Sequence, residues 1–385
     1  MTAPKVSPFQ VHIDIDIIER IRGRVVDAHW TSAPKDDQDW TYGTDAAWLK
    51  RLAVYWATRY DWDAAQTRLN RWPQFKVEID GQDIHFYHVR SSSPRRRALV
   101  LTHGWPGSVV EFLACVERLA YPERFGGLPD EGFDLVIPSL PGYGFSGRPD
   151  RPIGPRAVAR IWRTLMTDVL GYSSFGAQGG DWGAAVTSWL GIDHADVTRA
   201  IHLNMVPSWI FAPAPNSDPR ESDYHARVAA MRLKEMGYFA VQSTKPQTLA
   251  FALSDSPIGF ASWVCEKFRT WGDTHGDIES KFDLDSLITN LMLYLVTDSV
   301  GPALWMYRGR AQEAALGEPV PRVEVPTGIA LFPAEIIPYP PREVADRAYF
   351  IVRWTPMRAG GHFAALEEPE AFSDEVRAYF SQVGL

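Results

Sequence analysis

The feature that most constrains this chain is a change of pattern near residue 98. From there on, short apolar runs alternate with longer amphipathic segments. The apolar runs lie at 98–102, 134–138, 174–178 and 200–203. Each run has the length of a buried strand, whereas the segments between them have the length and apolar spacing of helices. The alternation therefore predicts strand–helix–strand units and a mostly parallel sheet.

The segments on either side of this alternation differ from it. The first ninety-odd residues read as helical segments followed by a hairpin, and they end in a polar connector. After Pro207 the pattern is one of helices and loops, and strand-like runs return at 327–332 and 349–354. A helical segment inserted between strands of one sheet is typical of a lid. We expect an N-terminal domain at 1–95, a core in two parts at 96–207 and 322–385, and a helical lid at 208–321.

Charge and apolar content exclude several classes of protein. The formal net charge of -8 argues against nucleic acid or an anionic membrane as the main partner. No stretch approaches the ~18 uninterrupted apolar residues of a membrane span, and the first residues do not have the pattern of a signal peptide. Cys115 and Cys265 each lie in an apolar stretch, which predicts two buried thiols and no disulfide. We expect a soluble, cytoplasmic protein.

Residues 174–183, Ser-Phe-Gly-Ala-Gln-Gly-Gly-Asp-Trp-Gly, are the most informative stretch of the chain. A strand-like run enters a glycine-rich turn and leaves as a helix, predicted at 184–190. In a nucleophile elbow, one side chain stands on a sharp turn between two glycines, as serine does in Gly-x-Ser-x-Gly. Here Gly179 and Gly183 flank Asp181, which is the candidate nucleophile. The alternative is that Asp181 only caps the helix that follows.

An aspartate in place of serine changes the chemistry. Gly-x-Ser-x-Gly occurs nowhere in the chain, which argues against a serine esterase. A carboxylate is ionised near neutral pH and can displace a leaving group from saturated carbon without a base to activate it. The product is an ester on the protein, and its hydrolysis needs an activated water and an oxyanion site.

The oxyanion site and the water-activating groups have candidates in three loops. The loop 103–108, His-Gly-Trp-Pro-Gly-Ser, follows the strand at 98–102, so the amides of Trp105 and Trp182 would form the oxyanion hole. His103 is expected to hold this loop by hydrogen bonding. His362, on a glycine-rich turn after the last strand, is the candidate base. Glu335 is the candidate acid because it follows the strand at 327–332, with Asp298 and Asp346 as weaker rivals.

Several strings together resemble the microsomal and juvenile-hormone epoxide hydrolases, a family of the α/β-hydrolase superfamily. They are His-Gly-Trp-Pro-Gly-Ser (103–108), Pro-Gly-Tyr-Gly-Phe-Ser (141–146), Gly-Gly-Asp-Trp-Gly (179–183) and Gly-Gly-His-Phe-Ala-Ala-Leu-Glu-Glu-Pro-Glu (360–370). Similar strings at 71–76 and 236–246 extend the resemblance over nearly the whole chain. The resemblance implies an α/β-hydrolase fold with a mostly parallel sheet, a helical lid insertion and an N-terminal extension. It also places Glu335 and His362 where the family has its acid and base.

The resemblance further implies an enzyme that converts an epoxide to a vicinal diol through an ester on Asp181. An epoxide opens to an alkoxide, and tyrosine hydroxyls can donate hydrogen bonds to its oxygen because their usual pKa near ~10 keeps them protonated. The lid offers Tyr224, Tyr238, Tyr294 and Tyr307, and spacing alone does not choose among them. The family's motifs map its tyrosine pair onto Tyr238 and Tyr307.

Two other functions remain open from the sequence. A haloalkane or haloacid dehalogenase shares the fold and an Asp-Trp elbow, but halide leaves without a proton and would favour N–H donors over a tyrosine pair. A hydrolase-fold binding protein without activity would not need the aspartate, glutamate and histidine.

The expected reactants and partners follow from the same resemblance. We expect no metal and no organic cofactor, with a small apolar epoxide and water as the reactants and no nucleic acid as a partner. We expect no N-terminal membrane anchor like that of the microsomal members, since the chain resembles a soluble bacterial-type relative. The sequence does not decide whether the chain forms a homodimer.

Overall fold

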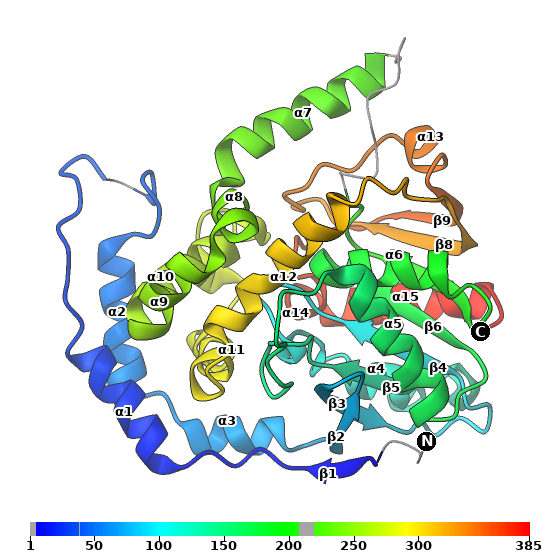
Figure 1. The fold of residues 1–385 in the computed structure, drawn as a ribbon, viewed down its shortest axis with the longest axis horizontal. Helices are drawn as coiled ribbons and strands as arrows, with labels where there is room; N and C mark the ends of the chain where they lie inside the picture. Colours follow the sequence, from blue (N-terminus) through cyan, green and yellow to red (C-terminus); the bar gives the residue numbers. More distant parts are fainter. Residues whose placement is uncertain (1–4, 38, 208–218) are drawn as a thin grey trace.

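The structure is a computed structural model that describes residues 5–37, 39–207 and 219–385. Nine strands form one sheet in the order β1-β2-β3-β5-β4-β6-β7-β8-β9 (Figure 1). The strands are β1 (Ser7–Phe9), β2 (Gln74–Ile79), β3 (Gln82–Val89), β4 (Ala98–Thr102), β5 (Asp134–Pro138), β6 (Phe175–Gly179), β7 (Thr198–Leu203), β8 (Val323–Leu331) and β9 (Tyr349–Pro356). From β5 through β9 every pair of neighbours is parallel, whereas β1, β2 and β3 join antiparallel at one edge.

The helices group by position along the chain. The N-terminal helices are α1 (Ile15–Val26), α2 (Ala46–Thr58) and α3 (Trp62–Leu69). The core helices are α4 (Val116–Ala120), α5 (Pro155–Thr164), α6 (Asp181–Asp193), α13 (Arg342–Ala345), α14 (Ala364–Glu367) and α15 (Pro369–Gln382). Between β7 and β8 lie α7 (Pro219–Glu235), α8 (Gly237–Thr244), α9 (Pro246–Asp255), α10 (Pro257–Trp271), α11 (Leu284–Val296) and α12 (Val300–Ala314).

The sheet separates two apolar cores because successive side chains of a strand point to opposite faces. In β4, Val100 belongs to the core shared with α5 and α6, whereas Leu99 and Leu101 belong to the core shared with α4 and α15. Both faces of the central strands are therefore covered by helices, which explains why these strands are continuous apolar runs in the sequence. The α/β-hydrolase fold expected from the sequence is confirmed.

The strands predicted at 98–102, 134–138 and 174–178 lie within one residue of their observed bounds, whereas those predicted at 200–203, 327–332 and 349–354 are longer than expected. The strand predicted at 327–332 begins earlier, at Val323, and contains Pro326 at a shift in the register with β9. Proline is tolerated in a sheet at such irregular positions. Helix α6 begins at Asp181, three residues before the predicted start at 184. The prediction was late because the glycine at position 183 weakens the helical pattern of the first turn.

The lid helices lie above the carboxyl ends of the strands, and the N-terminal helices pack beside them (Figure 1). Helices α1 and α2 contact α10, and α3 contacts α11. Trp48 Nε1 donates to Glu279 Oε1 at 3.0 Å across this contact. The first part of the predicted lid, 208–218, falls outside the described residues. In the described ranges no single helix is long and apolar enough to cross a membrane; only α11 and α12 together, bent by 86°, pass on length and composition.

Candidate active site

The turn between β6 and α6 places Asp181 in a strained conformation at the start of a helix. Its φ is +47°, in the left-handed region that side chains other than glycine rarely adopt. Gly180 occupies the N-cap position, so the side chain of Asp181 does not cap α6. A Cβ on Gly183 would overlap the carbonyl oxygen of Thr102, and a Cβ on Gly179 would overlap Gly183. The two flanking glycines are thus required by close backbone approach, which leaves the Asp181 side chain free to face a cavity.

The loop after β4 brings a backbone donor to this carboxylate. The N–H of Trp105 donates to Asp181 Oδ1 at 2.8 Å. His103 holds the loop, as the sequence predicted: its Nε2 accepts from the N–H of Leu140 at 3.1 Å, and its Nδ1 donates to the carbonyl of Gly104 at 2.9 Å. Burial lowers the pKa of His103 to about 4, so the ring is neutral and suited to this paired role.

The second amide expected in the oxyanion hole is that of Trp182. It follows Asp181 directly and stands in the first turn of α6. The N–H groups of a helix's first turn have no acceptor within the helix. The amides of Trp105 and Trp182 therefore come from the two loops that the sequence analysis selected.

His362 and Glu335 meet Asp181 from the ends of β9 and β8. His362 Nε2 lies 3.4 Å from Asp181 Oδ2, and His362 Nδ1 lies 3.0 and 3.1 Å from the two oxygens of Glu335. Since Nδ1 faces a carboxylate, it carries a proton and Nε2 points toward Asp181. The two weaker candidates for the acid lie elsewhere. Asp346 Oδ2 is 3.9 Å from Arg342 Nε, and Asp298 lies in the turn between α11 and α12.

The charge of this triad decides the protonation of the histidine. Burial on its own would lower the pKa of His362, but the carboxylates of Glu335 and Asp181 outweigh it and hold that pKa well above 6.5. His362 is thus an imidazolium between two carboxylates when Asp181 is ionised. Any reaction that removes the charge of Asp181 also removes part of what keeps His362 protonated.

The loop that carries His362 is hydrogen-bonded to the lid. The His362 N–H donates to the carbonyl of Trp271 at 3.0 Å, at the end of α10. Glu367 accepts the N–H groups of Gly361, Phe363 and Asp273 at 2.7–2.9 Å. Burial raises the pKa of Glu367 to about 7, although the three hydrogen bonds from these N–H groups act to lower it. Sequence reasoning did not assign a role to Glu367, because its partners lie in the lid and in the histidine loop and no spacing rule connects them.

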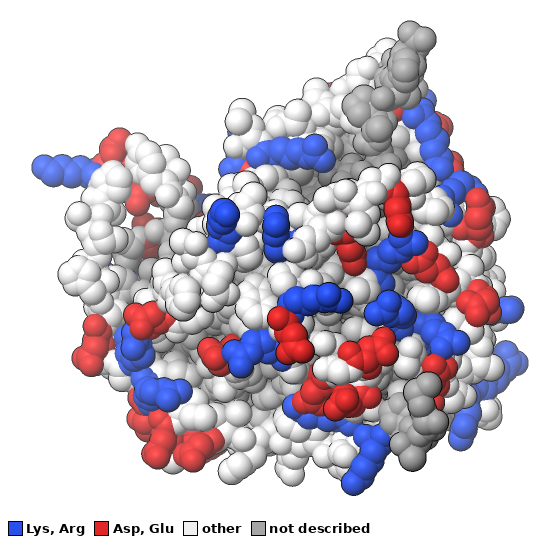
Figure 2. Space-filling model, in the orientation of Figure 1, with Lys and Arg blue, Asp and Glu red and all other residues white. Residues whose placement is uncertain are grey.

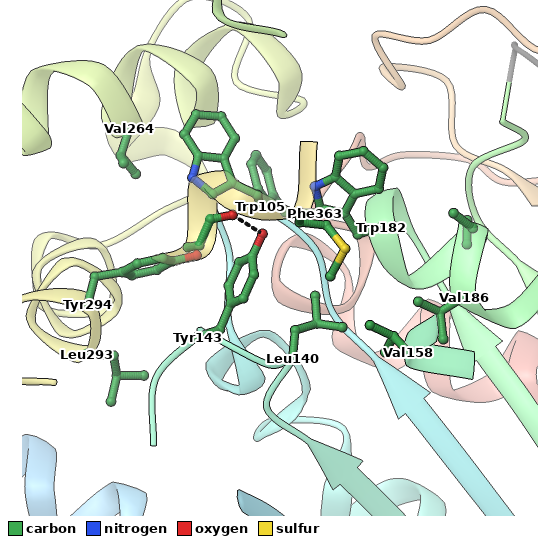
Figure 3. Close-up of a cluster of buried hydrophobic side chains, with 14 of the residues drawn as sticks. Trp105, Leu140, Tyr143, Val158, Trp182, Val186, Val264, Leu293, Tyr294 and Phe363 are labelled. Carbon is green, nitrogen blue, oxygen red and sulfur yellow. Dashed lines mark hydrogen bonds between the residues drawn. The ribbon is translucent and has the colours of Figure 1, made fainter. Parts of the chain in front are cut away.

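Tyr238 and Tyr307 are the two lid tyrosines that reach Asp181. They line, together with Asp181, a cavity of about 280 Å³ whose other walls are mainly apolar. Tyr238 stacks on Trp105 with ring centroids 5.2 Å apart, and Tyr307 packs edge-on to Trp182 at 4.7 Å. Figure 3 shows Trp105 and Trp182 in the same cluster of buried side chains as Leu140 and Tyr143.

The other two lid tyrosines do not line this cavity. The hydroxyl of Tyr294 donates to the carbonyl of Gly107, and Tyr224 is buried in α7. Burial raises the pKa of Tyr238 and of Tyr307 well above 10, with the charge of Asp181 adding to both shifts. Both hydroxyls therefore stay protonated and can donate. The pair that the resemblance selected is also the pair that the fold brings together.

The comparisons with known proteins agree with this arrangement. Residues 6–112 match the family described as epoxide hydrolase N terminus, and residues 97–261 match the alpha/beta hydrolase fold. A Stigmatella aurantiaca protein assigned as an epoxide hydrolase is 37% identical over 98% of this chain and 85% of its own length. Epoxide hydrolase 1 of Sus scrofa is 33% identical over 97% of this chain and 88% of its own. The crystal structure of juvenile hormone epoxide hydrolase from Bombyx mori superposes with a TM-score of 0.88 at 30% identity, covering 99% of this chain and 95% of that chain.

Proposed function

Because this chain belongs to the epoxide hydrolase family, and is therefore an enzyme that opens epoxides with water, we propose that its reaction proceeds through an ester on Asp181. The observation that carries the proposal is the placement of Asp181. Its carboxylate stands at the cavity wall with two tyrosine hydroxyls ahead of it in the lid and His362 Nε2 3.4 Å away. The nucleophilic carboxylate of Asp181 thus has both the proton donors and the base as neighbours.

In the first step, an oxygen of Asp181 attacks an epoxide carbon and the C–O bond of the ring breaks. The ring oxygen becomes an alkoxide, a poor leaving group unless hydrogen-bond donors stabilise it. Tyr238 and Tyr307 supply these donors, and one of them transfers its proton to the oxygen. Since both tyrosines have raised pKa values, the tyrosinate readily takes back a proton. His362 can supply that proton as it becomes neutral.

In the second step, the ester is hydrolysed. The ester of Asp181 is uncharged, so the pKa of His362 falls at the stage that needs a base. His362 Nε2 then takes a proton from water, and the hydroxide attacks Cγ of Asp181. The amides of Trp105 and Trp182 stabilise the oxyanion. The diol leaves as the proton on His362 passes to its oxygen. The second proton of the water, left on the carboxyl group of Asp181, then returns to His362, and Glu335 stabilises the restored imidazolium.

A direct test is diol formation by Asp181→Ala. Loss of the nucleophile should reduce turnover by about 10⁴-fold or more. Asp193→Asn is a matched control, because Asp193 ends the same helix and pairs with Arg156 at the protein surface. The control should keep its activity. Full diol production by Asp181→Ala would exclude an ester on this residue.

The same assay addresses the dehalogenase alternative. The indole rings of Trp105 and Trp182 lie beside the cavity, but two protonated tyrosines suit an alkoxide better than a halide. One panel of epoxides and chloroalkanes, scored for diol and for halide, separates the two reactions. We expect diol alone.

The properties of the molecule also support proposals on its substrate and location. The apolar walls of the cavity, including Met205, Phe239 and Ile337, favour a small apolar epoxide. On the face in Figure 2, acidic and basic side chains are interspersed and no stripe of one sign runs across it, which does not favour nucleic acid as a partner. We propose a cytoplasmic enzyme; detection of its activity in the soluble fraction of its cells tests this.

A further inference from the structure

A second, much smaller cavity borders the same carboxylate. It offers about 10 Å³ of space for the centre of a water molecule, which is about the minimum that holds one water. Asp181 lines both cavities, whereas the two tyrosines line only the larger one and His362 lines only the smaller. The reactants of the two proposed steps would thus approach Asp181 from different cavities.

Glu111 places a carboxyl group in the wall of this small cavity. It belongs to the short helix η1 (Val109–Phe112), directly after the loop that carries Trp105. Its Oε1 lies so close to Gly107 that a Cβ there would overlap it. The glycine at 107 therefore makes the room that the carboxyl group of Glu111 occupies.

We expect the carboxyl group of Glu111 to be protonated at neutral pH. Burial raises its pKa to about 8, with the charge of Asp181 adding to the rise and that of His362 and a contact with the Ser108 amide opposing it. A protonated carboxyl group has a carbonyl oxygen and an O–H to satisfy, and the Ser108 amide uses only part of this capacity. Buried polar groups of this kind are commonly satisfied by an ordered water.

We propose that Glu111 binds the hydrolytic water in the small cavity and orients it between His362 and the ester carbon of Asp181. This inference rests on the ester mechanism proposed above. The water gives one hydrogen to His362 Nε2 and directs the other to the carbonyl oxygen of Glu111, which leaves an oxygen lone pair for Cγ of Asp181. Glu111 keeps its own proton throughout, so the step balances with the proton moving only from water to His362.

The test separates the two chemical steps by single-turnover kinetics. Wild type, Glu111→Gln and Glu111→Ala are mixed with a slight deficit of styrene oxide, and the ester and diol are followed by rapid quench and intact mass. Glutamine keeps the carbonyl acceptor, so Glu111→Gln should hydrolyse the ester within about threefold of wild type. Glu111→Ala should slow ester hydrolysis by about 10- to 100-fold while ester formation changes by less than about threefold. The ester should therefore accumulate only in the alanine variant.

Glu313→Ala is the matched control for a merely structural effect. Glu313 is also a largely buried carboxyl group with a raised pKa, but it accepts the N–H groups of Arg156 and Ala157 and lines neither cavity. This variant should lose stability and keep the wild-type ratio of the two rates.

Two results would overturn the inference. Ester hydrolysis at the wild-type rate in Glu111→Ala would show that Glu111 does not hold the water, and an equal loss in both steps would show a structural role only. If wild type itself forms no ester, the proposed mechanism fails as well, and this outcome is visible before any Glu111 variant is compared.

Discussion

The two sides of the larger cavity are built by different forces. On the core side, hydrogen bonds fix the groups: Asp181 accepts from the Trp105 amide, and both oxygens of Glu335 face His362 Nδ1. On the lid side, aromatic packing fixes Tyr238 and Tyr307 against Trp105 and Trp182. The Tyr307 hydroxyl is buried, and the side chain it interacts with is Tyr238, the other lid tyrosine of the cavity.

This difference indicates a division of labour. The core groups are positioned by contacts with one another, so they are ready to form and hydrolyse an ester whatever leaving group is present. The two lid hydroxyls interact with each other and use one O–H between them, so the other O–H remains to donate to a substrate oxygen. The core would then carry the ester chemistry, and the lid would decide which electrophile reacts.

After loss of the nucleophile itself, the largest effect expected on the core side comes from Glu335→Gln. The amide keeps the shape of the side chain but removes the charge that stabilises the imidazolium of His362. Ester hydrolysis should slow by about 10³-fold, by the logic of a triad acid, while ester formation changes little. Rapid-quench kinetics measures the two rates, and a selective loss of ester formation would contradict the assigned division.

On the lid side, Tyr238→Phe with Tyr307→Phe removes both hydroxyls and keeps the ring packing. Ester formation from epoxides should fall by about 10²- to 10³-fold, the usual contribution of general acids. Hydrolysis of an ester once formed should be nearly unchanged. A double variant that opens epoxides at the wild-type rate would show that the lid does not select the electrophile.

A smaller effect concerns stability and pH at Glu111. The folded chain holds this carboxyl group at a pKa of about 8, whereas the ordinary value is 4.5. Between these values the unfolded chain has lost a proton that the folded chain keeps, so the wild type loses stability as pH rises from about 5 to about 8. Glu111→Gln cannot ionise. It should gain on the order of 2 kcal/mol relative to wild type over this range, and the gain should level off above pH 8.

Urea unfolding of both proteins at several pH values measures this difference. Glu313→Gln, at a carboxyl group outside both cavities, shows how much of the gain is general to buried acids. A stability difference that does not change with pH would mean that Glu111 is ionised in the folded protein, and would remove the basis for a protonated carboxyl group in the small cavity.

Residues that act through local backbone geometry could be predicted from the sequence. Asp181 is recognisable because a strained turn needs Gly179 and Gly183 around it, and Trp105 because its loop follows a predicted strand. His362 and Glu335 follow strand ends, where the loops of a parallel sheet converge.

Residues that act through distant contacts could not be predicted in this way. Glu367 accepts the N–H of Asp273 of the lid, 94 residues away, and Glu111 gains its role only because the fold brings Asp181 and His362 to the same small cavity. The choice of Tyr238 and Tyr307 among four lid tyrosines also needed the resemblance, since lid packing decides which hydroxyls reach Asp181. No local pattern encodes these contacts.

The central claim, an ester on Asp181, is tested most directly by intact mass and peptide mapping of His362→Gln after exposure to an epoxide. Without the base, the ester should form and persist, so the protein gains the mass of one substrate molecule and the added mass maps to residue 181. Wild type should show no lasting gain, because it hydrolyses the ester. No added mass in His362→Gln, or added mass on another residue, would contradict the account.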